Sequence, residues 1–183
     1  MSFSDYVDSG SFRFGEHDLY RDFGLRLVEV IGDALQPQLR ERKRTIPSRS
    51  GAYDFGARFY DERTVTLSCE SARAMPRASW RELSYILSRK GRLYIFNEPD
   101  KYYIGRVYDP AQIETARFEL VRFELRFICE PFAYGETIQR NFQGLYAPNY
   151  TGTAATPTRI EITNTGVRDA VGIRIMQIDK KVI

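Results

Sequence analysis

The chain has 183 residues, of which 43% are hydrophobic and 28% charged, and its formal net charge is +3. These values are ordinary for a globular protein and exclude a disordered or fibrous one. The length suits one domain with a proper core, or one domain and part of a second. The small charge does not require a nucleic-acid partner, because acidic and basic residues are interspersed.

Two kinds of targeting segment are missing from the sequence. No apolar run approaches the roughly 18 residues of a membrane helix, and the first residues lack the charged and apolar regions of a signal peptide. We therefore expect no membrane insertion, and synthesis in the cytoplasm.

Aromatic residues are abundant, with twelve Tyr, twelve Phe and one Trp, many of them at alternating positions. This pattern favours strands over a helical bundle. We expect strands over residues 11–15, 25–31, 63–70, 92–97, 101–108 and 121–130. Residues 98–100, Glu-Pro-Asp, suit a tight turn that joins two of these strands into a hairpin.

Two strands have the clearest half-buried pattern. In residues 63–70, Val65, Leu67 and Cys69 share one face, and residues 121–130 alternate apolar and mostly charged side chains up to Pro131. A strand of this second kind is the natural spine of an antiparallel sheet or an open barrel. Cys69 and Cys129 lie at apolar positions, so we interpret them as buried free thiols, with a disulfide as the less favoured case.

One helix is predicted at about residues 77–90, where the apolar period changes. Ser79 and Glu82 have the spacing of a capping box, and Lys90-Gly91 supplies a basic residue and a C′ glycine at the end. The apolar stripe needs a sheet to lie on, and it consists of Trp80, Leu83, Ile86 and Leu87. The fold class is therefore mainly β (α+β), with one packed helix.

A basic segment begins at Gln36 and carries Arg40, Arg42 and Arg44 at a spacing of two, so that in a strand all three face one side. The simpler interpretation is a solvated edge strand protected by charge. The functional interpretation is a basic surface that faces a channel or a neighbouring subunit.

The loop from Ile46 to Gly56 follows the basic segment and has the chemistry of a turn. Pro47 fixes its own φ and removes an amide donor, while Gly51 and Gly56 permit positive φ. The backbone is therefore expected to reverse direction here, between the basic segment and the strand of residues 63–70.

The C-terminal part of the chain differs in composition from the first 135 residues, which we expect to form the first domain. Residues 136–157 are rich in Asn, Gly, Thr, Ala and Pro, which is typical of a linker. Residues 158–164 and 171–178 are predicted strands around a turn at Asn164-Thr165-Gly166. Two strands cannot bury a core alone, so they join another unit or begin a β-sandwich over residues 158–183.

No active site is assembled by the sequence. His17 is the only histidine, and no nucleophile-elbow glycine pattern accompanies it. The cysteines lack metal-ligand spacing, and no cofactor motif is present. Glu98, Asp100 and Asp109 are better explained by turn chemistry than by sugar hydrolysis. We expect a protein that is not an enzyme, with no metal and no cofactor.

Seven dispersed motifs together point to a family. In chain order they are Phe12-Arg13-Phe14-Gly15, Asp22-Phe23-Gly24-Leu25, the loop 46–56, residues 60–70, the helix beginning near Ser79, residues 93–109 and residues 118–134. This set, in this order, resembles the N-terminal domain of distal tail proteins from phages with long non-contractile tails. Residues 149–153 with Pro157 are similar to that family's entry into a C-terminal β-sandwich. The family's sandwich is normally longer than residues 158–183, so the resemblance implies either a truncated second domain or an unusually short member of the family.

The resemblance implies a structural role in the virion, at the tail tip. Such proteins form rings, usually hexameric, that join the tail tube to the host-recognition hub or fibre, and the genome passes through the channel. The implied partners are other copies of the chain, the tail tube protein and the hub or fibre protein, with DNA only in transit. The implied subunit contacts are Arg40, Arg42, Arg44, Pro47, Arg49, Tyr53 and Phe55.

Two further functions stay open from the sequence. The many tyrosines and the possible sandwich are also compatible with a carbohydrate-binding module of a phage baseplate. A tail-tube subunit is similar to the first hypothesis, because ring-forming β proteins of one tail look alike at the level of sequence pattern.

Overall fold

The computed structural model describes residues 10–31, 36–56, 59–71, 73–109, 121–144, 146–147, 152–169 and 171–175. The chain divides into two units, Met1–Phe142 and Gln143–Ile183. Residues 149–151 of the family-like entry motif and residues 176–178 of the last predicted strand lie outside the described residues. Each unit is considered separately below.

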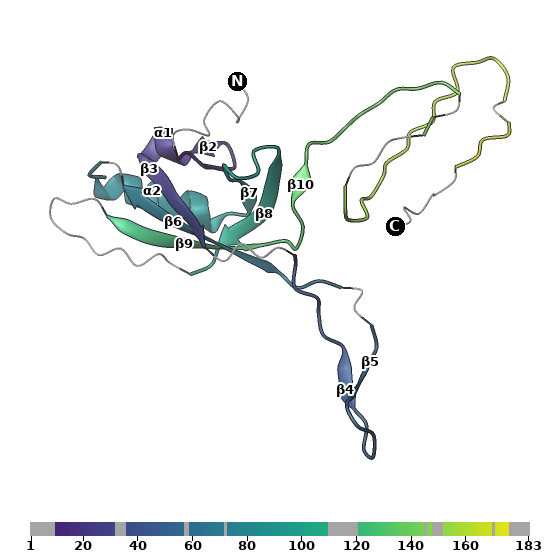
Figure 1. The fold of residues 1–183 in the computed structure, drawn as a ribbon. Helices are drawn as coiled ribbons and strands as arrows, with labels where there is room; N and C mark the ends of the chain where they lie inside the picture. Colours follow the sequence, from purple (N-terminus) through teal and green to yellow (C-terminus); the bar gives the residue numbers. More distant parts are fainter. Residues whose placement is uncertain are drawn as a thin grey trace. The chain divides into compact units, whose positions relative to one another are not determined.

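The first unit is built on an antiparallel sheet with the strand order β2-β1-β7-β8-β9-β6-β3 (Figure 1). Short β10 pairs with one end of β8. The strand bounds are β1 Arg13–Phe14, β2 His17–Asp18, β3 Leu25–Ile31, β6 Arg63–Ser71, β7 Gly91–Tyr94, β8 Lys101–Val107, β9 Arg122–Cys129 and β10 Tyr134–Gly135. The predicted mainly β class with an antiparallel sheet is confirmed.

The sheet curls without closing into a barrel in the part of the chain that the structure describes. The amide of Leu27 on β3 donates a hydrogen bond of 2.7 Å to the carbonyl of Gly10, which lies three residues before β1 in the chain. This bond links the β3 edge to the segment that leads into the opposite end of the sheet. The curled sheet encloses an apolar core on its concave side.

Strands β6 and β9 pair over the longest continuous register, from Arg63 opposite Cys129 to Glu70 opposite Arg122. Apart from Ile128, their apolar residues lie on one face, as the alternation predicted, and these are almost completely buried: Val65, Leu67, Cys69, Phe123, Leu125, Phe127 and Cys129. The opposite face carries hydroxyl and charged side chains. This pair is the spine of the core.

Helix α2 (Arg77–Ser88) covers the core with the predicted stripe. Leu83 and Leu87 are buried, and Trp80 packs edge-on against Phe123 with ring centroids 5.4 Å apart. The predicted stripe is therefore confirmed as core.

The helix begins at the predicted residue and ends close to the predicted one, but the predicted capping motifs are wrong. The helix begins at Arg77, with Pro76 in extended conformation as the N-cap, so Ser79 lies inside the first turn and forms no capping box. At the other end Arg89 is the C-cap and Gly91 begins β7. Gly91 serves packing rather than a turn, since a Cβ there would lie 2.9 Å from the ring of Phe14.

A short helix, α1 (Leu19–Phe23), was not predicted because five residues are too few for a visible 3.6-residue period. Asp18 caps it by accepting hydrogen bonds from the amides of Tyr20 and Arg21, at 3.1 and 3.0 Å. The same carboxylate oxygen accepts a bond of 2.7 Å from the hydroxyl of Ser11, and both side chains are buried. Gly24 ends the helix with a φ of 71°.

The second unit carries no helix or strand in its described residues. The predicted strands at 158–164 and 171–178 are therefore not formed where the structure describes them, because two extended segments without a sheet to pack on are only marginally stable. The predicted turn is present: Asn164 accepts a bond of 3.0 Å from the amide of Gly166 and donates one of 2.9 Å to the carbonyl of Arg168. A sandwich in this region stays a prediction.

Replacing Gly105 tests the tightest strand contact of the sheet. Gly105 lies opposite Cys129, and a Cβ at this position would lie 2.5 Å from the Cys129 sulfur and 2.6 Å from the carbonyl oxygen of Ile128. We expect Gly105→Ala to lower the free energy of unfolding by about 1–3 kcal/mol, because the overpacked strands must separate. Chemical denaturation measures this change. Gly135→Ala is the control, since its Cβ would meet only the Lys101 Nζ at 3.9 Å, and an equal loss in both variants would contradict the explanation.

The Asp18 cap provides a second stability test. We expect Asp18→Ala to cost about 2 kcal/mol in the free energy of unfolding, because α1 loses its cap and the buried hydroxyl of Ser11 loses its acceptor. In a double-mutant cycle, Ser11→Ala combined with Asp18→Ala should lose less than the sum of the single losses. Strictly additive losses would show that the Ser11–Asp18 bond contributes nothing.

Candidate functional site

A hairpin between β3 and β6 forms a separate two-stranded sheet of β4 (Lys43–Thr45) and β5 (Ala52–Asp54). Figure 1 shows it as a narrow ribbon leading away from the main sheet of the first unit. Its ladder continues toward its root, where the amide of Phe55 donates to the carbonyl of Arg42 at 3.0 Å and the amide of Arg40 to that of Phe59 at 2.9 Å. The predicted basic segment is thus one side of an arm, which we call the β4–β5 arm (residues 38–61).

The tip of the arm is the predicted turn. The amide of Arg49 donates a bond of 3.2 Å to the carbonyl of Ile46, and Gly51 has the expected positive φ, 80°. Ser48 also has a positive φ, 67°, which the sequence did not indicate. Gly56 has a φ of 81° on the return side, and its amide is bound at 2.9 Å by the carboxylate of Asp54. The reversal of the chain in this loop is confirmed.

Five of the predicted site residues share one face of the arm. Arg44 lies directly opposite Tyr53, and residues opposite each other in a ladder point to the same side. Arg42 and Phe55 form the next such pair along the ribbon, because each lies two residues further on the same side. Arg49 at the tip completes the set, with its guanidinium 5.5 Å from the centre of the Tyr53 ring. We call this set the basic–aromatic face: Arg42, Arg44, Arg49, Tyr53 and Phe55.

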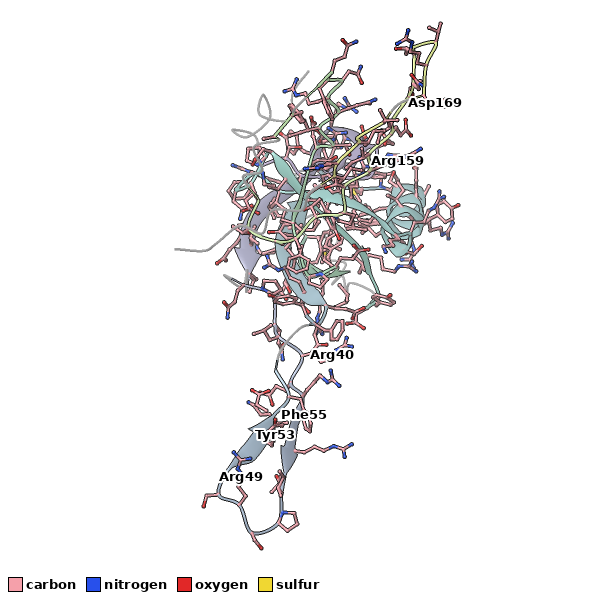
Figure 2. The ribbon with its side chains drawn as sticks, turned by 90° about the vertical axis from the view of Figure 1, so that its right-hand side faces the viewer. Arg40, Arg49, Tyr53, Phe55, Arg159 and Asp169 are labelled. Atoms are coloured by element: carbon pink, nitrogen blue, oxygen red, sulfur yellow. The ribbon has the colours of Figure 1, made fainter. Side chains whose placement is uncertain are left out.

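The aromatic pair of this face is exposed but ordered by its neighbours. The rings of Tyr53 and Phe55 meet edge-to-face with centroids 4.8 Å apart, and they are 42% and 56% exposed. Figure 2 shows both rings on the ribbon, with Arg49 nearer the tip and Arg40 nearer the root. Large apolar rings held at the surface beside cations are typical of contact surfaces rather than of a core.

The charges of the arm are sorted by face. The basic–aromatic face contains no carboxylate, whereas Glu41, Lys43 and Asp54 alternate onto the opposite face, where the Lys43 ammonium lies 3.4 Å from Glu41. One side of the arm is therefore positive and aromatic, and the other is close to neutral. An acidic or polar protein surface is the chemical complement of the positive side.

The two remaining predicted residues lie at the two ends of the arm. The Arg40 guanidinium bonds to Asp61 at 2.7 Å across the root of the arm, so its charge is compensated within the hairpin. Pro47 lies in the tip turn. The sequence analysis missed Asp61 and the contact of Tyr60 with Phe132, whose ring centroids are 4.9 Å apart at the root. In the sequence, Arg42 and Phe55 lie at equal distances from the central turn, and so do Arg44 and Tyr53. The cross-strand pairs could therefore have been predicted from the sequence.

The carboxylates considered for sugar hydrolysis are held in separate local contacts. Glu98 accepts a bond of 2.8 Å from the Tyr103 hydroxyl, Asp100 bonds to the adjacent Lys101, and Asp109 lies 3.6 Å from Arg126. His17 lies 3.6 Å from Asp22 beside α1. No group of side chains able to hold a metal occurs among the described residues. None of the helices in the described ranges is long and apolar enough to cross a membrane.

The two cysteines are buried free thiols, as predicted. Burial raises the pKa of the Cys69 thiol to about 12, and mainly burial raises that of Cys129 to about 12 as well. The thiolate is the reactive form of cysteine, so neither residue can act as a nucleophile near neutral pH.

Thiol titration tests this burial. We expect the native protein at pH 8 to react negligibly with a thiol reagent, because both thiols stay protonated and shielded, and two thiols per chain to appear once denaturant is added. The absorbance of the chromophore that the reagent releases, read before and after unfolding, gives the number of reactive thiols in each state. Rapid native reaction would contradict the packing, and no reaction after unfolding would indicate a disulfide.

Comparison with known proteins gives one family and one fold match of note. A family model described as phage tail protein RIFT-related domain matches residues 16–129, well over half of the chain. The crystal structure of the Dit protein of phage SPP1 matches with a TM-score of 0.55 and 22% sequence identity. Its title calls Dit a paradigm of the hub adsorption apparatus in phages that infect Gram-positive bacteria. The match covers 69% of this chain and 52% of the Dit chain, and a search of curated proteins finds no match.

Proposed function

This chain belongs to the phage tail protein RIFT-related domain family, and from that premise we propose that it is a structural protein of the tail tip that forms a ring. The ring is hexameric and joins the tail tube to the host-recognition hub or fibre of a phage with a long non-contractile tail. Its partners are further copies of the chain, the tail tube protein and the hub or fibre protein. DNA passes through its channel only in transit.

The β4–β5 arm is the observation that carries this proposal. The described residues of the arm from Gln38 to Tyr60 are all exposed, so they contribute little to the core of their own unit. An exposed arm that contacts a different surface on the next copy makes a heterologous interface, and such interfaces generate rings when the rotation closes. Tyr and Arg are enriched in protein interfaces, which is the composition of the basic–aromatic face.

The arginines of the arm are assigned to a neighbouring subunit rather than to the channel. Strong contacts with phosphate groups would retard the passage of DNA. We therefore do not expect a row of unpaired arginines on the wall of the channel. Arg42 and Arg44 make no ion pair within the described ranges, whereas Arg40 is already neutralised by Asp61. We therefore place Arg42 and Arg44 against carboxylates of the next copy, and leave Arg40 with a role in holding the root of the arm.

The fold match supports the same position in the tail. At 22% identity the likeness to Dit concerns the fold alone, and this chain spans about half the length of the Dit chain. The family model covers residues 16–129, which contain α2 and most strands of the sheet on which the arm is mounted. Residues 158–183 remain the proposed start of a second β domain.

A carbohydrate-binding module receives less support from the geometry. The tyrosines that would stack on sugar rings form a row across β7, β8 and β10: Tyr94, Tyr102 and Tyr134. Their centroids are 5.4 and 5.8 Å apart, so they face one another, and Tyr102 is only 9% exposed. Arg13 and Arg92 cover the rings of Tyr94 and Tyr102, at 5.3 and 4.7 Å. The ring faces that a sugar needs are thus already occupied.

Charge reversal on one face of the arm tests the proposal. We expect Arg44→Glu to shift the purified protein from rings to monomers in light scattering, because a carboxylate would then oppose the acids of the neighbour. Lys43→Glu makes the same charge change at the adjacent residue on the opposite face, and it should leave the rings intact. Higher salt should weaken the wild-type ring, since exposed ion pairs are screened beyond about 8–10 Å.

The result that overturns the arm assignment is an Arg44→Glu variant that still forms complete rings. A wild-type chain that stays monomeric at every concentration, with tube and hub proteins added, would overturn the ring itself. Images of the same fractions on a grid would give the number of subunits in each ring.

A further inference from the structure

The outward face of α2 carries a regular row of long side chains that the core does not use. Arg77, Arg81, Tyr85 and Arg89 follow one another at intervals of four residues, and all are exposed, Tyr85 to 64%. The interval of four places them on one side of the helix. The buried stripe of Leu83 and Leu87 occupies the other side. We call the outward row the α2 arginine stripe.

The charge of this stripe is not compensated by the protein itself. Within the described residues, Arg77 and Arg81 make no ion pair and no side-chain hydrogen bond, and Arg89 contacts only the Tyr85 ring, at 5.7 Å. Glu82 is the single acidic residue of the helix. Other exposed arginines have acidic partners, such as Arg122 with Glu70 and Arg126 with Asp109. The stripe is therefore a distinct positive surface.

Helix stability does not explain these arginines. The first turn of a helix favours acidic side chains because of the helix dipole, yet the first turn of α2 contains none and begins with Arg77. The last turn contains no basic residue, although Arg89, the C-cap, lies at the end where a cation is favourable. The helix dipole therefore does not explain Arg77 and Arg81, which lie in the N-terminal half of the helix.

The spacing of the stripe indicates the shape of its partner. At 1.5 Å per residue the side chains recur about every 6 Å, over about 18 Å of helix. A second α-helix with carboxylates at every fourth residue has the same repeat, and the guanidinium fork binds a carboxylate with two parallel hydrogen bonds. The exposed Tyr85 ring in the middle of the row adds an apolar contact. A single file of cations is also narrower than the broad basic surface by which proteins bind duplex DNA.

We propose that the α2 arginine stripe is a docking site for an acidic α-helical segment of another protein. The partner helix lies along α2 with one carboxylate facing each arginine, and an apolar residue of the partner covers Tyr85. This surface belongs to a different element from the β4–β5 arm, so its occupation does not depend on ring formation.

Two labelled peptides test this docking on the full-length chain. The first is an alanine-rich helix with glutamate at every fourth position, and the second contains the same residues permuted so that the glutamates surround the helix. In fluorescence anisotropy we expect the first to bind at least tenfold more tightly than the second. Binding should weaken strongly between 0.05 and about 0.5 M salt, as contacts between charged side chains do.

Charge reversal locates the site. The double variant Arg77→Glu/Arg81→Glu should lose at least tenfold in affinity for the first peptide, while its thermal unfolding stays as in the wild type or improves, because an acid at position 77 then occupies the first turn. Arg44→Glu on the arm is the matched control and should bind the peptide normally. A chain that loses rings with Arg44→Glu but keeps peptide binding separates the two proposals.

Three results would overturn the docking site. They are equal or absent binding of the two peptides, unchanged binding by Arg77→Glu/Arg81→Glu, and tighter binding of a labelled DNA duplex that the same double variant abolishes. The last result would assign the stripe to nucleic acid instead of protein.

Discussion

The pairing of β6 with β9 is the constraint on which the rest of the first unit depends. Its register, from Arg63 opposite Cys129 to Glu70 opposite Arg122, places the apolar side chains of both strands on one face. That face receives α2 through Trp80 and Leu83. Because side chains alternate along a strand, a slip of one residue would move the whole apolar set to solvent and leave the helix without a surface. The next strand, β8, can approach β9 closely only because Gly105 has no side chain.

The arm is stabilised by different interactions from those of the core on which it is mounted. Its stability comes from a backbone ladder, the turn at its tip and the Arg40–Asp61 pair at its root, with little buried apolar area. Such a ribbon can present Tyr53 and Phe55 to another surface without any change in the core. The aromatic pair and Arg49 already contact one another, so less conformational freedom is lost when the face is covered by a partner. This is a suitable device for assembly, since binding and folding are kept separate.

Cations on the protein surface fall into two groups with different surroundings. Many arginines are neutralised by a carboxylate on the neighbouring strand, as in Arg122 with Glu70, or lie over a tyrosine ring, as in Arg92 with Tyr102. The basic–aromatic face and the α2 arginine stripe are the surfaces where several guanidinium groups gather without carboxylates. The mild net charge of +3 conceals this distribution, because acidic residues elsewhere balance it. Local arrangement, more than total charge, decides which surfaces attract acidic partners.

Sequence alone determined which face of each long element is buried, because alternation in Arg63–Ser71 and the four-residue apolar stripe of Arg77–Ser88 are periodic signals. It also located the turn of the arm, since Pro47 and Gly51 act through local backbone geometry. Tertiary structure decided the order of the strands, the caps of α2, the short helix capped by Asp18, and the pairing of Arg40 with Asp61. Alternation states which side of a strand is apolar but does not name its neighbour, and a five-residue helix is too short to show a period. Contacts between residues far apart in the chain, such as Arg40 with Asp61 or Gly105 against Cys129, exist only once the strands have paired.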